Sequence, residues 1–153
     1  MSSNGTLYFE PEVQEFFKKW HSKVSFNISI DGNKQLHDSC RLFPDGTGSY
    51  DKAIAAVHHY IDTYHEHMGS KMTLAPQNIM YAYEAVMGLI NEGYDSINLN
   101  CVFEKGWEDK DAVILYQQLK KLADYIIDND LEEDLYISMF TERMFQPKTL
   151  EDK

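Results

Sequence analysis

Apolar and polar side chains alternate along residues 24–31, and the alternation ends at an Asp-Gly pair. Successive side chains of a strand point to opposite faces, so this segment would have one apolar and one polar face. The apolar set is Val24, Phe26, Ile28 and Ile30. Asp31 followed by Gly32 is typical of the turn that ends such a strand. The pattern therefore predicts a half-polar β-strand.

Two later segments alternate in the same way. Residues 96–103 place Ile97, Leu99, Cys101 and Phe103 against Ser96, Asn98, Asn100 and Val102. Residues 71–75 place Met72 and Leu74 against Lys71, Thr73 and Ala75. Helix-length spacers between the three segments predict parallel strands, and parallel strands covered on both faces usually read as continuous apolar runs. The alternation instead predicts an α/β fold, a partial (β/α) barrel whose parallel strands carry helices on the outer face and polar residues in the lumen.

Periodic apolar positions predict helices in the spacers. The first begins at Pro11, and its core-facing stripe is Val13, Phe16, Phe17 and Trp20. The second follows Ser49 as N-cap and ends at Gly69, and its buried positions are Ile54, Val57, Ile61 and Tyr64. The third lies between Asn78 as N-cap and Gly93 as terminator.

A fourth helix is predicted over residues 108–127, after Gly106. Its expected inward positions are Ala112, Tyr116, Leu119, Ala123 and Ile126. Residues 135–140 could form a further strand. A complete eight-fold barrel takes about 250 residues, so we expect about half a barrel in residues 1–130, followed by a C-terminal tail over 131–153. Residues 2–6 have the character of a strand end, and we expect this chain to be a fragment.

Composition excludes several classes of partner. Fourteen basic against 25 acidic residues give a net charge of −11, which argues against non-specific binding to nucleic acid or to an anionic membrane surface. No apolar run approaches the roughly 20 residues of a membrane span. The two cysteines, Cys40 and Cys101, are expected to stay reduced, in keeping with a cytoplasmic location.

Several short motifs follow one another along the chain in an informative order. They are Asn4-Gly5-Thr6, Ser29-Ile30-Asp31-Gly32, Leu36-His37-Asp38 with Arg41, and Gly48-Ser49-Tyr50-Asp51. In these motifs the chain resembles radical S-adenosylmethionine (AdoMet) enzymes, above all the branch of anaerobic sulfatase-maturing enzymes and peptide maturases with a cluster-bearing C-terminal extension. Residues 33–38, 70–76 and 98–107 look most like maturases of ribosomal peptides, and the resemblance covers nearly the whole chain.

The resemblance implies a cofactor and a substrate class. In this family a [4Fe-4S] cluster reduces AdoMet to a 5′-deoxyadenosyl radical, which abstracts hydrogen from a peptide substrate. The cluster ligands are three cysteines spaced Cys-x3-Cys-x2-Cys, and a Gly-Gly-Glu segment binds the methionine amino group. Neither motif is present in this sequence, and Cys40 and Cys101 cannot replace three clustered thiolates. Asn33 also stands where sulfatase maturases carry proline.

Six polar residues are candidates for the AdoMet pocket. Ser29 matches the family's contact to the ribose or carboxylate of AdoMet, and the alternative is a serine bonded only to backbone. Asp31 would anchor a hydroxyl or a lysine in addition to its turn role, and Arg41 suits a carboxylate. Thr73, Asn98 and Asn100 would project into the lumen toward adenine or a peptide backbone, or else form a polar network among themselves. Leu99 and Val102 lie near the family's adenine-packing position, but a one-residue register shift would reverse their faces.

One metal-like spacing has an ordinary explanation. His58, Asp62 and His65 could share a helix face, although polar residues on an outer helix face usually contact solvent. The function that the chain best fits is therefore part of a radical AdoMet enzyme that modifies a peptide, inactive by itself and without cluster ligands. The alternative is a non-enzymatic α/β binding module. Exposed sheet edges would favour self-association in either case.

Overall fold

The computed structural model describes residues 1–103 and 106–140. Within them a single parallel sheet has the order β1-β2-β3-β4-β5. Its strands are β1 (Ser2–Ser3), β2 (Asn27–Ile28), β3 (Gly69–Leu74), β4 (Ser96–Cys101) and β5 (Tyr136–Ile137). Spatial order follows chain order, so each strand reaches its neighbour through a crossover, as the helix-length spacers predicted.

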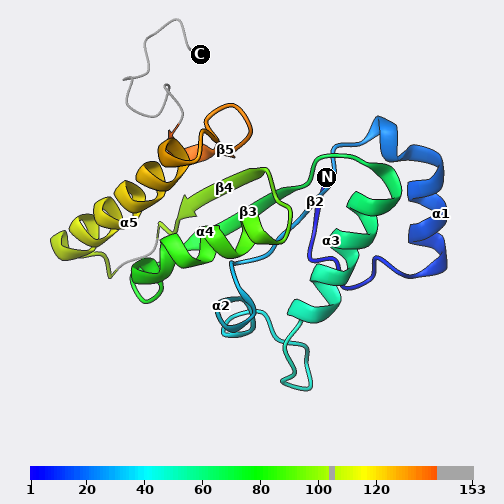
Figure 1. The fold of residues 1–153 in the computed structure, drawn as a ribbon. Helices are drawn as coiled ribbons and strands as arrows, with labels where there is room; N and C mark the ends of the chain where they lie inside the picture. Colours follow the sequence, from blue (N-terminus) through cyan, green and yellow to red (C-terminus); the bar gives the residue numbers. More distant parts are fainter. Residues whose placement is uncertain (104–105, 141–153) are drawn as a thin grey trace, which may run out of the picture.

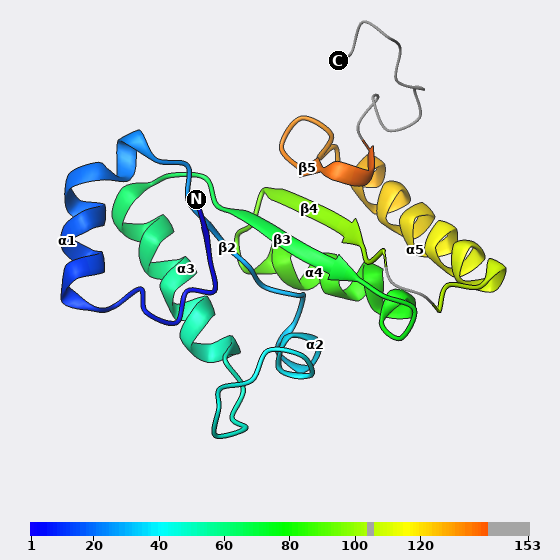
Figure 2. The same ribbon diagram turned by 180° about the vertical axis from the view of Figure 1, so that it is seen from behind.

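Helices cover one side of this sheet. The α-helices are α1 (Pro11–Trp20), α2 (Lys34–Asp38), α3 (Tyr50–Tyr64), α4 (Ala82–Asn91) and α5 (Asp109–Asp128). Short 3-10 turns add η1 (His21–Lys23), η2 (Ile79–Tyr81) and η3 (Ser138–Phe140). The two opposite views show α3, α4 and α5 on one side, while β3 and β4 are bare on the other (Figure 1, Figure 2). The predicted α/β class with helices on one face is confirmed.

The pairing of β3 with β4 decides which residues share a face. Lys71 lies opposite Asn98 and Thr73 opposite Asn100, so these polar residues lie on the bare face. The core lies between the other face and the helices. From the strands it takes Ile28, Met72, Leu74, Ile97 and Leu99, and from the helices Val57, Tyr60, Val86, Leu89, Leu122 and Ile126.

Two helices differ in detail from their predicted faces. In α1 only Phe17 is buried, with Val13 packed partly against the core, while Phe16 and Trp20 are exposed, because the helix lies at the rim. In α5 the predicted inward positions Ala112 and Tyr116 are exposed. Its buried line instead comprises Asp111, Leu122 and Ile126, with Leu115 and Leu119 packed alongside.

The start of α5 gives a physical reason for this rotation. The Glu108 side chain accepts from the Asp111 backbone, and the Asp111 carboxylate accepts from Glu108 N–H at 2.8 Å, forming a capping box. This box holds Asp111 on the inner side. Residues that follow at steps of three or four along the same line, beginning with Leu115, then face inward, which turns Tyr116 toward solvent.

The connection from Asn33 to Gly48 contains α2, which the sequence did not predict. Asn33 caps it by accepting from Leu36 N–H at 3.1 Å. Ser49 precedes α3 as predicted, but its side chain makes no cap, since Asp38 Oδ1 accepts Tyr50 N–H at 2.9 Å instead. Gly69 does not end α3, because the helix closes at left-handed His65 and Gly69 begins β3.

Side chains replace backbone pairing where β2 ends. The Ser70 hydroxyl accepts from Ile30 N–H at 3.3 Å and donates to Ile30 O at 3.0 Å. One residue further, Thr73 N–H donates to the Asp31 carboxylate at 3.3 Å. These bonds satisfy the backbone groups of Ile30 and Thr73 where the segment after β2 separates from β3. That segment then turns into α2 (Figure 1). None of the helices in the described part of the chain has the length and hydrophobicity to span a membrane.

Candidate functional site

Asp31 is the centre of the candidate site. Only 8% of the residue is exposed, and it follows β2 at the carboxyl end of the sheet. The Arg41 guanidinium donates to both carboxylate oxygens, through Nε to Oδ2 and through Nη2 to Oδ1 at 3.4 Å. Thr73 N–H and the Cys40 thiol, at 3.6 Å, complete the shell. Asp31 is thus a buried anchor for Arg41 rather than a carboxylate that is free to bind a ligand.

His37 links the backbone of Asp31 to that of Arg41 through the Ser49 hydroxyl. It is 1% exposed, its Nδ1 accepts Asp31 N–H at 3.2 Å, and its Nε2 lies 3.0 Å from Ser49 Oγ. Ser49 Oγ donates to Arg41 O at 2.9 Å, so the hydroxyl must accept from the ring. The ring is therefore neutral with its proton on Nε2. Burial lowers the pKa of His37, which agrees with that assignment.

The ion pair also affects the ionisation of its neighbours. The hydrogen bond from Arg41 to Asp31 raises the pKa of the guanidinium, which keeps its charge. Burial and the nearby Asp31 carboxylate raise the pKa of the Cys40 thiol, so that it stays protonated. Arg41 uses two of its five N–H groups on Asp31, leaving three for an anionic ligand.

The remaining candidates lie on the bare face of the sheet. Thr73 and Asn100 are neighbours near the carboxyl ends of β3 and β4, and Asn98 lies two pairs nearer the amino ends. Ser29 is half-buried, with its hydroxyl 3.4 Å from that of Ser2. In α/β sheets, ligands bind outside the carboxyl ends of parallel strands, which is where Asp31, Thr73 and Asn100 meet.

The register of β3 with β4 shows on which face Leu99 lies, and it places a further polar residue, Lys71, on the bare face. Leu99 is 4% exposed and packs in the core, on the side opposite Asn98 and Asn100. Lys71 stands beside Asn98 on the bare face and brings a cation that the sequence reading did not include. His37 and Ser49 were also missed as site residues. Their signal was a histidine and a serine within the polar stretch that separates Asp31 from the next helix.

The space around Asp31 limits what could bind there. A cavity of about 20 Å3 lies between β3, α2 and α4, lined by Asp31, Leu36, Ser39, Met72, Thr73, Leu74, Asn78 and Ala85. This volume suits a water-sized group. A ligand the size of AdoMet would have to lie across the bare face. On that face Asn98 and Asn100 carry amides that can donate and accept hydrogen bonds.

The side chains that the structure describes do not fit a [4Fe-4S] cluster. Both cysteines are free, and no group of three His, Cys, Asp or Glu side chains is placed to hold a metal within residues 1–103 and 106–140. His58 Nε2 instead lies 2.8 Å from Glu92 Oε2. His65 closes α3 in the left-handed conformation, away from any such set.

Comparison with known proteins shows a structural match only. No protein-family model matches the sequence, and no curated protein matches it significantly. Among solved structures, native anSMEcpe with bound AdoMet, an anaerobic sulfatase-maturating enzyme, matches with a TM-score of 0.71 at 19% sequence identity. Native anSMEcpe with bound AdoMet and Kp18Cys peptide matches with a TM-score of 0.72, also at 19% identity.

The extent of the match is asymmetric. The alignment covers 91% of this chain and 39% of the AdoMet-bound structure, or 40% of the peptide-bound one. The chain has the fold of part of a radical AdoMet enzyme. The expected resemblance in fold is therefore confirmed, and the chain spans about two fifths of the structures that it matches.

Proposed function

We propose that this chain forms part of the AdoMet pocket of a radical AdoMet enzyme that modifies a peptide, of the ribosomal-peptide maturase type. The observation that carries the proposal is the match of 91% of the chain to AdoMet-bound anSMEcpe, combined with polar residues gathered at the carboxyl edge of the sheet. A peptide substrate is supported by anSMEcpe structures with bound Kp18Cys and Cp18Cys peptides. With only Cys40 and Cys101 in the sequence, the cluster cysteines would come from residues outside it.

Each candidate has a role in this proposal. Ser29 hydrogen-bonds the ribose or the carboxylate of AdoMet. Arg41 binds the carboxylate through the N–H groups that Asp31 leaves free, and Asp31 holds the guanidinium in place. Thr73, Asn98 and Asn100 contact adenine or the peptide backbone from the bare face.

Calorimetric titration of the full chain with AdoMet tests the proposal. We expect saturable binding that weakens about three- to tenfold in Ser29→Ala, because one hydrogen bond to the ligand is lost. Ser25→Ala is the matched control, since this exposed serine precedes β2 at the opposite end of the strand and should leave affinity unchanged. Absence of saturable binding, or equal affinity in both variants, would contradict the assigned pocket.

The chain alone should be catalytically silent. Incubation with iron and sulfide should leave it without a stable [4Fe-4S] spectrum, and it should not cleave AdoMet. A stable cluster accompanied by cleavage would overturn this part of the proposal. A cytoplasmic location stays a prediction.

A non-enzymatic binding module is the second candidate. The observation in its favour is that β1 and β5 each pair on one side only among the described residues, which leaves two edges able to recruit another chain. Peptide binding that persists unchanged in Ser29→Ala, without AdoMet binding, would favour this function over the first.

A further inference from the structure

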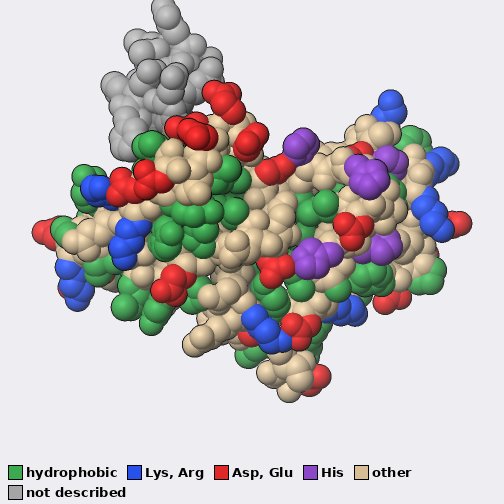
Figure 3. Space-filling model, viewed as in Figure 1, with side chains coloured by type: hydrophobic (Ala, Val, Ile, Leu, Met, Phe, Trp, Pro, Cys, Tyr) green, Lys and Arg blue, Asp and Glu red, His purple; other side chains and the backbone are tan. Residues whose placement is uncertain are grey.

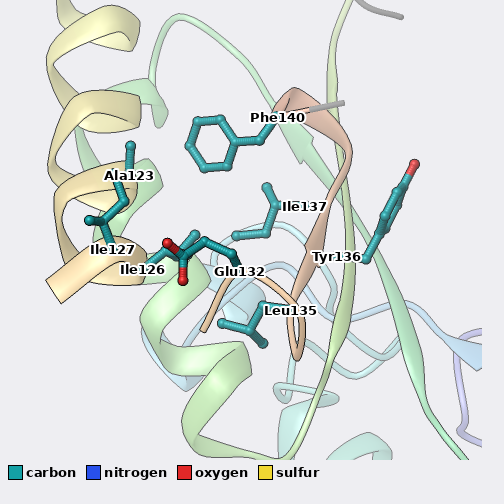
Figure 4. A pocket seen from close by; sticks show the side chains of 8 residues that line it. All are labelled: Ala123, Ile126, Ile127, Glu132, Leu135, Tyr136, Ile137 and Phe140. Atoms are coloured by element: carbon teal, nitrogen blue, oxygen red, sulfur yellow. The ribbon is translucent and has the colours of Figure 1, made fainter. Parts of the chain in front are cut away.

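An apolar groove lies between α5 and β5, away from the polar face described above. Its volume is about 360 Å3, and its lining is Ala123, Ile126, Ile127, Glu132, Leu135, Tyr136, Ile137 and Phe140. Figure 4 shows Ile126 and Ile127 on the helix at one side of the groove and Ile137 on the strand at the other, with Phe140 at one end. The volume falls within the ~300–1,000 Å3 of small-ligand sites. This groove has room for several apolar side chains.

The groove is open, and part of its apolar lining is exposed to solvent. Ile127 is 60% exposed, Tyr136 48% and Phe140 41%. Beside it, β5 pairs with β4 on one side, and no described strand pairs with its other side. Exposed apolar side chains next to an unpaired strand edge are typical of a surface that binds another polypeptide.

The charged side chains of the segment that lines the groove are all acidic, and Asp124 among them pairs with Lys120 on the preceding turn of α5. Residues 122–140, which supply its whole lining, contain no lysine, arginine or histidine. Their charged side chains are Asp124, Asp128, Asp130, Glu132, Glu133 and Asp134. Figure 3 shows acidic side chains gathered over the end of α5 and the loop toward β5. Glu132 itself lines the groove, so the acidic rim and the apolar floor form one surface.

We propose that this groove binds a basic amphipathic segment of a partner polypeptide, with apolar side chains on its floor and lysine or arginine against its rim. A second copy of the chain would bring the same acidic rim into contact, at an electrostatic cost. The chain's own residues 141–153 carry three acidic and three basic side chains and offer no net positive charge to the rim. A cationic partner complements both features. The inference is independent of the AdoMet pocket.

Fluorescence anisotropy with a labelled heptapeptide of alternating leucine and lysine tests the proposal on the full chain. Ile127→Ser should weaken binding about tenfold, because it removes an apolar contact from the floor. Val113→Ser is the matched control, since this exposed residue lies on α5 but outside the groove. Both residues are more than half exposed, so neither variant should unfold the protein. Glu132→Gln should weaken binding and flatten its salt dependence, whereas Glu15→Gln on α1 should do neither.

Specific outcomes would overturn the proposal. Equal affinity for a peptide of alternating serine and lysine would show that the binding depends on charge alone and not on the apolar floor. Equal affinity for a peptide of alternating leucine and glutamate would remove the role of the rim. Tighter peptide binding by Phe145→Ser would assign the groove to the chain's own C-terminal residues. Dimerisation that is lost in Ile127→Ser, without peptide binding, would assign it to a second copy.

Discussion

The hydrogen bonds of the fold control the protonation state of His37. It accepts from Asp31 N–H on one side and donates to Ser49 on the other, so a second ring proton would break the first bond. Burial lowers its pKa from the usual 6.5, which means that the unfolded chain binds a proton more readily than the folded one. The neutral His37 ring therefore contributes fully to the stability of the fold above pH 6.5, the pKa in the unfolded chain. This contribution is lost as the pH falls below 6.5 through the lowered pKa of the folded state.

A pH-dependent unfolding measurement follows from this linkage. The free energy of unfolding should fall between about one pH unit above and about one unit below 6.5, and His37→Gln should reduce that fall because glutamine does not titrate. His65→Asn is the control, because His65 is exposed and asparagine suits its left-handed backbone. Urea unfolding at both pH values checks the expectation. Equal slopes in the wild type and in His37→Gln would show that the ring does not titrate with folding.

Gly32 is needed for both its backbone and its size. Its φ is +91°, and an added Cβ would lie 2.6 Å from the Ala85 Cβ on α4. We expect Gly32→Ala to lower the free energy of unfolding by about 2–4 kcal/mol, from the left-handed strain plus the overlap. Gly46→Ala separates the two causes, because Gly46 has φ +84° with nothing within 4 Å. It should cost only about 1–2 kcal/mol, and equal losses in chemical denaturation would remove the packing argument.

At the scale of elements, α5 shows how a regular pattern leaves a choice of faces. Its apolar residues fit two overlapping stripes, one through Tyr116 and one through Leu122. The capping box between Glu108 and Asp111 favours the second stripe. The sequence therefore predicted the helix almost to its ends but placed its inner face one position away from the observed line.

Paired alanine substitutions test the observed face of α5. Leu122→Ala should lower the free energy of unfolding by about 2–5 kcal/mol, because a side chain that is 1% exposed leaves a cavity in the core. Tyr116→Ala should change it by less than about 0.5 kcal/mol, because Tyr116 is 68% exposed. Thermal and urea unfolding of both variants give the comparison. A larger loss in Tyr116→Ala would restore the face that the sequence pattern favoured.

For the whole molecule, the open sheet predicts self-association through β1. The carbonyls of Met1 and Ser3 accept from Asn27 N–H and Ser29 N–H of the β2 segment, so the backbone of Ser2 between them points outward. We expect concentration-dependent association in sedimentation experiments. Ser2→Pro should abolish it by removing the outward donor, whereas Ser2→Ala should keep it. A strictly monomeric profile at high concentration would contradict the prediction.

The alternation of side chains determined much of the molecule by itself. Because a strand has a side-chain period of two, residues 24–31, 71–75 and 96–103 already separated the polar face from the core. The spacer lengths predicted parallel strands, and this is confirmed. The predicted faces hold along β3 and the first part of β4, whereas Asp31 and Ala75 of the expected polar face are buried and Phe103 of the expected apolar face is exposed. Lumen positions such as Thr73 and Asn100 could be named from this local rule alone, whereas their binding role remains a proposal.

Only the tertiary structure decided what depends on contacts between distant segments. The register of β3 with β4 placed Leu99 in the core, and the approach of residues 36–49 to Asp31 made the Arg41 pair and the His37 network. The groove beside β5 likewise needs α5 to lie alongside it. Alternation and helical periodicity are local properties of the chain, whereas these hydrogen bonds and cavities arise from the packing of elements far apart in sequence.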